Sequence, residues 1–234
     1  MNCLTRAAFL MFAMFASAAF ATSYEDVIES TSLLEGAETC SYTIASTGGE
    51  ARLEERFSPG TGEDGWVLVA VNAEAPSEDD FRAYRKRREQ RSRRNHPLTF
   101  DPKKIPKPGT IEISDEDAET VTFTFAMQPA EDDENARITE QLTGTMVFSK
   151  TERRPLTLVV QNEAPLSAGP GVKMTEFRQS FRFRNHPIFE VPFAEETQFH
   201  MRGKAFVFKT IEVDRTLKFS AFDCTNTVSA QATW

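Results

Sequence analysis

The sequence is poor in the residues and motifs on which enzyme chemistry most often depends. Among its 234 residues there are only three histidines, His96, His186 and His200, and three cysteines. It has no Gly-x-Ser-x-Gly elbow, no His-Glu-x-x-His pair, no glycine-rich phosphate loop and no Cys-x-x-Cys pair. We therefore expect a protein that is not an enzyme and that holds neither a cofactor nor a metal. A hydrolase whose site is assembled from scattered residues is the alternative.

Long hydrophobic runs are also scarce, and the one that stands out lies at the N-terminus. Arg6 precedes the apolar run Ala7–Phe15, and Ala19-Phe20-Ala21 has the small-x-small pattern of a signal-peptidase site. The run is too short to span a bilayer comfortably. Residues 1–21 are thus predicted to be an export signal that is cleaved near Ala21, which places the mature protein in the periplasm or outside the cell.

Removal of the signal takes Cys3 with it and leaves Cys40 and Cys224. Two cysteines in an exported chain are expected to pair. A Cys40–Cys224 disulfide would tie the first predicted strand to the last and close a loop of 185 residues, counting both ends. Two unpaired buried thiols are the alternative.

Positive charge is concentrated in one segment of an otherwise acidic chain. The formal net charge is −8, yet residues 82–107 hold eleven Lys and Arg against two acids, a local charge of +9. Ser77 and Asp80 are spaced as a helix-capping box, and the residues that follow are strong helix formers. We expect a basic surface helix within an insertion at 77–95, pinned by Phe81 and Tyr84.

The arginines of this helix are the first candidate functional group. The guanidinium group suits phosphate and carboxylate, so an anionic membrane surface or an acidic envelope protein is the expected partner, and nucleic acid is not expected outside the cytoplasm. Packing on the acidic remainder of the chain, or simple solvation, is the alternative. The candidate residues for contact with an anionic surface are Arg85, Arg88 and Arg91.

The rest of the chain alternates between apolar and polar residues, as β-strands do. Residues 22–234 are predicted to form one mainly β domain: a curled antiparallel sheet, as a half-open or closed barrel, with an N-terminal helix at Tyr24–Leu34. Trp66–Val71 is apolar enough to be buried on both faces, and Gly144 and Gly203 are expected to mark bulges or bends. The predicted strands are Glu38–Ser46, Ala51–Phe57, Trp66–Val71, Thr120–Met127, Arg137–Lys150, Leu156–Asn162, Lys173–Arg184, Thr197–Val207 and Thr210–Phe222.

Phenylalanine is the second candidate functional group. Sixteen of the twenty phenylalanines follow the signal, and several alternate with polar residues along the predicted strands. A curled sheet lined by such side chains can hold an acyl chain, whereas ordinary core packing is the alternative. The candidate ligand-binding residues are Phe123, Phe125, Phe177, Phe181 and Phe183.

A signal peptide, an N-terminal helix, long antiparallel strands, one helical insertion and further strands give a layout that resembles the periplasmic lipoprotein-carrier (LolA/LolB-like) families. The resemblance implies an incomplete barrel whose mouth is covered by helices and whose apolar cavity holds lipid. It is one of layout: Arg56-Phe57-Ser58-Pro59 followed by Trp66 differs in order and spacing from the carriers' Arg-Pro and Phe-x-Trp pattern, so no functional residue is carried over. A different exported bacterial family is the alternative.

Two functional hypotheses follow. The first is a non-enzymatic periplasmic binding or carrier protein for a lipid or another apolar molecule. The second is a structural or interaction module of the cell envelope, with a filled core, that docks through its arginine-rich helix.

Overall fold

The computed structural model describes residues 23–25, 27, 40–60, 65–90, 105–129, 135–185, 192–206 and 209–223. The predicted signal, Arg91 and Cys224 lie outside these residues. Of the predicted N-terminal helix, Tyr24, Glu25 and Val27 are described, and all three are helical.

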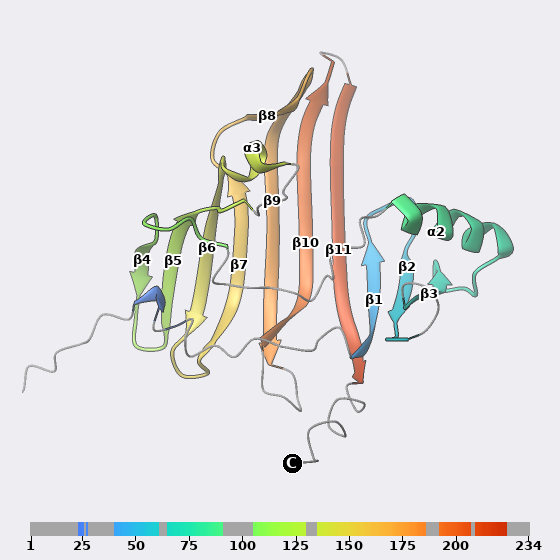
Figure 1. Ribbon diagram of the computed structural model, residues 1–234, viewed down its shortest axis with the longest axis horizontal. Helices are drawn as coiled ribbons and strands as arrows, with labels where there is room; N and C mark the ends of the chain where they lie inside the picture. Colours follow the sequence, from blue (N-terminus) through green and yellow to red (C-terminus); the bar gives the residue numbers. More distant parts are fainter. Residues whose placement is uncertain are drawn as a thin grey trace, which may run out of the picture.

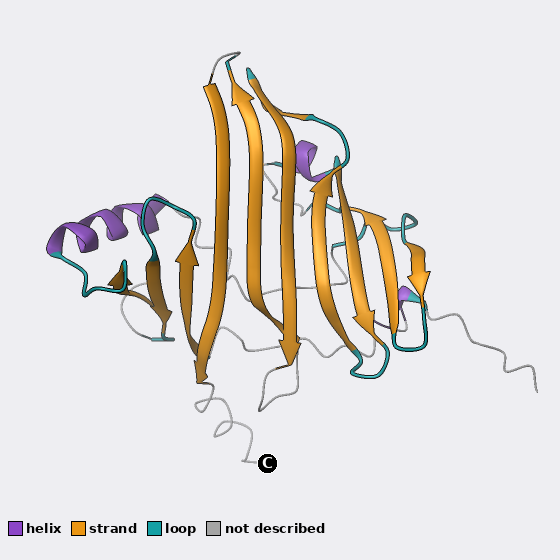
Figure 2. Ribbon diagram, turned by 180° about the vertical axis from the view of Figure 1, so that it is seen from behind, coloured by secondary structure: helices purple, strands orange, loops and turns teal. Residues whose placement is uncertain are grey.

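Apart from the helical residues near Tyr24, the described chain forms one antiparallel sheet with two helices (Figures 1 and 2). The helices are α2 (Glu78–Gln90) and α3 (Ala136–Thr139). The strands are β1 (Ser41–Thr47), β2 (Leu53–Phe57), β3 (Trp66–Val71), β4 (Glu112–Glu116), β5 (Thr120–Ala126), β6 (Leu142–Ser149), β7 (Arg154–Asn162), β8 (Leu166–Gly169), β9 (Val172–Asn185), β10 (Pro192–Ala205) and β11 (Lys209–Asp223).

Most neighbouring strands of the sheet are also consecutive in the chain, and in addition the first strand pairs with the last. The sheet runs β3-β2-β1-β11-β10-β9-β7-β6-β5-β4, with β8 paired to β9. The first strand therefore pairs with the last, and the two edges are β3 and β4, between which the chain carries α2 and several prolines (Figure 1). The predicted curled antiparallel sheet is confirmed in its open form, and it is not closed.

One face of the sheet carries the apolar side chains, and we call it the inner face. Direct register partners form a single row across ten strands on this face, because paired residues point to the same side. The row is mostly apolar, and it runs from one edge of the sheet to the other on the same face. Its members are Ile113, Phe123, Met146, Leu158, Phe181, Thr197, Leu217, Ser46, Leu53 and Val71.

Two buried clusters lie on the inner face. The larger is built on β5 to β10 and is covered in part by Tyr24, whose ring centroid is 5.1 Å from that of Phe123. The smaller is built on β1, β2 and β11, with Tyr42 at its centre. The rings of Phe57 and Trp66 lie 5.3 and 5.7 Å from the ring of Tyr42.

The opposite, outer face carries charged cross-strand pairs on the three long strands. Arg182 and Lys218 both contact Glu196, at 3.2 and 3.5 Å, and Arg202 contacts Glu212 at 2.9 Å. These residues alternate with the apolar side chains of the inner face, as the pleat of a strand requires. Two of the arginines that alternate with phenylalanine along β9, Arg182 and Arg184, thus contact acids on β10, whereas Arg178 donates to Gln161 on β7 at 2.9 Å.

Several predicted elements differ from the structure. The start of the predicted strand Arg137–Lys150 is instead helical and belongs to α3. In this turn the Glu140 N–H donates to the Ala136 carbonyl at 2.9 Å. The strands β4 and β8 are absent from the predicted set. The β3 strand was expected to be buried on both faces, but it lies at the sheet edge and Val67 is exposed.

Candidate binding pocket between helix α2 and strand β3

Helix α2 begins with the predicted capping box. The Ser77 N–H donates to Asp80 Oδ2 at 2.9 Å, and the Asp80 N–H donates to Ser77 Oγ at 3.2 Å. Hydrogen bonds from the Ser77 hydroxyl and N–H hold the pKa of Asp80 below its usual value. The first turn is acidic and the last turn basic, which complements the helix dipole. Part of the arginine content of this helix is therefore explained by helix formation itself.

Three side chains one turn apart point from α2 toward the sheet, but they are buried to different extents. Tyr84 is buried, Arg88 is half-buried, and Phe81 remains 38% exposed. The Arg88 guanidinium carbon lies 4.8 Å from the centroid of the Trp66 ring. Tyr84 is thus buried as predicted, whereas Phe81 is more exposed than predicted and Arg88 makes a further contact with the sheet.

The inner face of β1 and β2 carries buried polar side chains, and one of them, Tyr42, lies among aromatic rings. Tyr42 is fully buried, and this burial raises the pKa of its hydroxyl well above the ordinary value. The positive charge of Arg88 acts on the pKa of the same hydroxyl in the opposite direction, and the carboxylate of Glu55 raises it further. Glu55 is itself only 4% exposed. A buried carboxylate and a half-buried guanidinium are thus both close to Tyr42.

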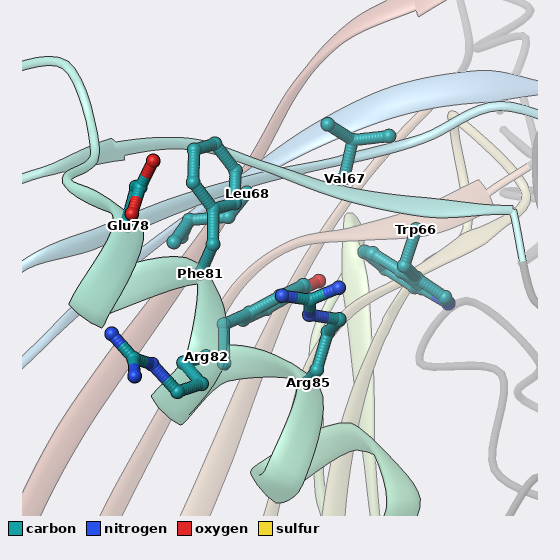
Figure 3. Close-up of a pocket in the computed structure, with 8 residues that line it drawn as sticks. Trp66, Val67, Leu68, Glu78, Phe81, Arg82 and Arg85 are labelled. Atoms are coloured by element: carbon teal, nitrogen blue, oxygen red, sulfur yellow. The ribbon is translucent and has the colours of Figure 1, made fainter.

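A pocket of about 690 Å³ lies between α2 and the edge strand β3 (Figure 3). Trp66, Leu68 and Phe81 give it an apolar wall, with the Phe81 side chain pointing from the helix toward Leu68. Charged groups stand at its rim: Glu78, Arg82 and Arg85. Arg82 is paired with Asp79, one turn earlier in the helix. Arg85 projects from the helix toward β3, between Phe81 and Trp66 (Figure 3).

The composition of this pocket suits a ligand with an apolar part and an acidic part. Its volume falls in the range of small-molecule sites, about 300–1,000 Å³. An aromatic wall provides apolar contact, and a guanidinium group binds carboxylate or phosphate through two parallel hydrogen bonds. The exposed Phe81 and Val67 would lose solvent contact if a ligand occupied the pocket.

The structure brings the five candidate phenylalanines together on the inner face, although not around this pocket. Phe123, Phe125 and Phe183 are buried members of the larger cluster, and Phe177 and Phe181 are half-buried against it. Three of the five are thus part of the packed core. None of them lines the pocket between α2 and β3.

The three candidate arginines have three different placements. Arg85 lines the pocket, Arg88 lies over Trp66, and Arg91 lies outside the described residues. Sequence reasoning did not find Trp66, Leu68 and Phe81 as site residues, because their partnership depends on how α2 folds back onto β3. The one signal in the sequence was the helical spacing of Phe81 and Arg85 within a segment otherwise poor in apolar residues.

Cys40 is fully buried at the start of β1, and the next residue, Ser41, lies opposite Asp223 of β11. Because Cys224 lies outside the described residues, its pairing with Cys40 stays a prediction.

His200 lies on the outer face, across the sheet from the large cluster. Its Nδ1 is 2.6 Å from Asp214 Oδ1, and its Nε2 is 3.5 Å from Glu176 Oε2. The hydrogen bond to Asp214 raises the pKa of His200. Within the described ranges, no group of three or more His, Cys, Asp or Glu side chains is placed to hold a metal ion.

Neither helix of the described chain is long and apolar enough to cross a membrane. Comparison with protein-family models, with curated proteins and with solved structures finds no match to this chain.

Proposed function

We propose that this protein is a non-enzymatic binding or carrier protein for an anionic amphiphile, a molecule with an apolar chain and an acidic head group such as a fatty acid or an anionic lipid. One observation carries the proposal: an aromatic wall and an arginine rim share one pocket of about 690 Å³ between α2 and β3. The wall would take the apolar chain, and Arg85 would take the acidic group.

The proposal includes export to the periplasm, with residues 1–21 as the cleaved signal and Cys40 paired to Cys224. It also keeps the resemblance to lipoprotein carriers as a working hypothesis, since an open antiparallel sheet is compatible with the incomplete barrel that this resemblance implies. The ligand is placed at α2 rather than among the core phenylalanines, because Phe123 and Phe125 have almost no exposed surface.

The test is binding of a fluorescent fatty acid by protein that has been refolded without lipid. We expect saturable binding that is weakened about tenfold or more by Arg85→Glu and by Phe81→Ser, since charge reversal and loss of the aromatic wall each remove a main contact. Lys86→Glu is the matched control, because Lys86 is the next residue of the helix, is exposed and does not line the pocket. Absence of binding, or equal losses in Arg85→Glu and Lys86→Glu, would reject the proposal.

Native mass spectrometry of the protein purified without detergent gives an independent readout. A bound mass that organic extraction removes would identify the class of ligand.

A second candidate function is docking of an acidic envelope protein, and the edge position of β3 favours it. An edge strand offers unpaired N–H and C=O groups to which a partner can add a strand, and α2 places Arg82 and Arg85 beside it. If this second function is the right one, the wild-type protein should not bind fatty acid. Reversing the charge of Arg85 should then abolish binding of the acidic partner protein. Arg88 is unsuited to this test, because its guanidinium group lies over Trp66.

A further inference from the structure

The three long strands, β9, β10 and β11, extend past their neighbours at one end of the sheet (Figures 1 and 2). This end, which we call the tip, consists of the turn between β8 and β9, the last residues of β10 with Phe206, and the first residues of β11. It lies away from α2, which sits beside β2 and β3 (Figure 1).

An aromatic side chain is displayed at the tip. Phe206 is 66% exposed, the highest value among the large hydrophobic residues that are exposed in the described chain. Its backbone is at φ 49°, a left-handed conformation that a bulky residue adopts at a cost. The Phe206 N–H donates to the Gly171 carbonyl at 2.7 Å, and a Cβ on Gly171 would come within 3.0 Å of the Phe206 ring. The ring is thus anchored to the neighbouring turn and still faces solvent.

Three lysines lie within three residues of Phe206 or of its backbone partner Gly171. Lys173, Lys204 and Lys209 are all exposed, and residues 166–174 and 203–211 contain no acid. Lys173 and Lys204 are direct register partners, and like charges placed opposite one another on adjacent strands repel. An anionic partner would relieve this repulsion. Farther from the tip, by contrast, Arg202 has its own acid, Glu212, at 2.9 Å.

We propose that the tip docks on an anionic lipid bilayer, with Phe206 entering the head-group region and the three lysines contacting acidic head groups. An apolar ring flanked by lysines matches the chemistry of a membrane interface, where the ring leaves water and the ammonium groups stay in it. The surface is separate from the α2–β3 pocket, so it also assigns the membrane contact to a different place from the basic helix.

Vesicle flotation tests the proposal, with the predicted export signal removed so that it does not itself bind lipid. The vesicles contain phosphatidylcholine alone or phosphatidylcholine with phosphatidylglycerol. We expect binding only to the anionic vesicles, and weaker binding at high salt. Each lysine lost should weaken binding roughly fivefold, so Lys173→Gln with Lys204→Gln should weaken it by about 25-fold.

The matched control is Lys86→Gln with Arg87→Gln, which removes the same charge from the exposed side of α2 and should change binding by less than about twofold. Phe206→Ser should also weaken binding, and because it removes an exposed ring it leaves the core intact. Thermal unfolding of each variant confirms that it is folded.

Equal losses in the tip and α2 variants would show general attraction to the basic helix and overturn the proposal, as would unchanged binding in the tip variants. These outcomes are separate from those of the proposed function, since fatty acid binding in the α2–β3 pocket is measured without vesicles.

Discussion

The guanidinium group of Arg88 lies over the indole ring of Trp66, with its central carbon 4.8 Å from the ring centroid. A cation over the face of a tryptophan is the strongest form of this interaction. It joins the last turn of α2 to the first residue of β3. Together with the buried Tyr84, it holds the helix against the sheet and fixes one wall of the pocket.

Removal of this contact should loosen α2 without unfolding the sheet. Arg88→Ala is expected to lower the free energy of unfolding by about 1–2 kcal/mol, because the cation–π contact and its packing are both lost. Urea unfolding followed by circular dichroism measures the change. Arg87→Ala, at an exposed position in the same turn, is the control and should change stability by less than about 0.5 kcal/mol. Equal effects of the two substitutions would mean that the contact with Trp66 does not hold the helix.

The cross-strand pair of His200 and Asp214 should make stability depend on pH. Since this contact raises the pKa of His200 in the folded protein, its stabilising effect is fully present below the ordinary histidine pKa of about 6.5 and is lost as pH rises through the raised value. Asp214→Asn should therefore lower the melting temperature more at pH 5.5 than at pH 8.5. Glu212→Gln is the control, because its partner Arg202 stays charged across this range and the effect should not vary with pH. A constant effect of Asp214→Asn would contradict the assignment.

Much of the sheet could be predicted because its strands alternate strictly. Phe177, Phe181 and Phe183 alternate with arginines, and the structure places the rings on the inner face and the arginines outside. Strands were missed where apolar residues do not alternate with polar ones. The strand β4 has every residue exposed, so its sequence resembles a solvated loop and only its pairing to β5 makes it a strand.

The two glycines within strands show which local signals can be interpreted from sequence. Gly203 lies at a register shift between β9 and β10, as a glycine in a strand suggests. Gly144 lies at no such shift. A glycine is needed there for another reason: the Phe125 ring of the neighbouring strand occupies the space that a side chain would take. The sequence does not distinguish the two cases, since both depend on a residue in another strand.

Only the helical side of the candidate site could be predicted from the sequence. The cap at Ser77 and the basic character of α2 are local and were found. The apolar wall of the pocket depends on contact between residues 66–68 and the helix, which no local pattern encodes. Arg88 shows the same limit: its charge suggested an external partner, whereas its position provides an internal one.

Gly144 should not tolerate a side chain. A Cβ at this position would lie 2.2 Å from Phe125 Cε2, and Phe125 is packed in the core with almost no exposed surface. Gly144→Ala is expected to lower the free energy of unfolding by about 1–3 kcal/mol, since the ring must move within a filled cluster. Denaturant unfolding measures this value. Combining it with Phe125→Leu should cost less than the sum of the two single changes, because the smaller side chain removes the clash. Additive costs would show that the ring does not lie over the glycine.

The Cys40–Cys224 pairing is open to a direct test, and the register of β1 with β11 supports it. Ser41, which follows Cys40, lies opposite Asp223, which precedes Cys224 in the sequence. The two cysteines thus adjoin, in sequence, a pair of residues that the sheet brings together, which favours a disulfide between them. A bridge that closes a loop of 185 residues would stabilise the fold by up to about 5 kcal/mol in the chain-entropy model.

The melting temperature of the protein should therefore fall in excess dithiothreitol, whereas that of Cys224→Ser should be low with or without the reductant. Because Cys40 is buried, dithiothreitol reaches a disulfide at this position only when the protein unfolds, so the reductant should be present throughout the melting experiment. If the wild-type protein melted at the same temperature with and without dithiothreitol, the predicted disulfide would not contribute to holding β1 against β11.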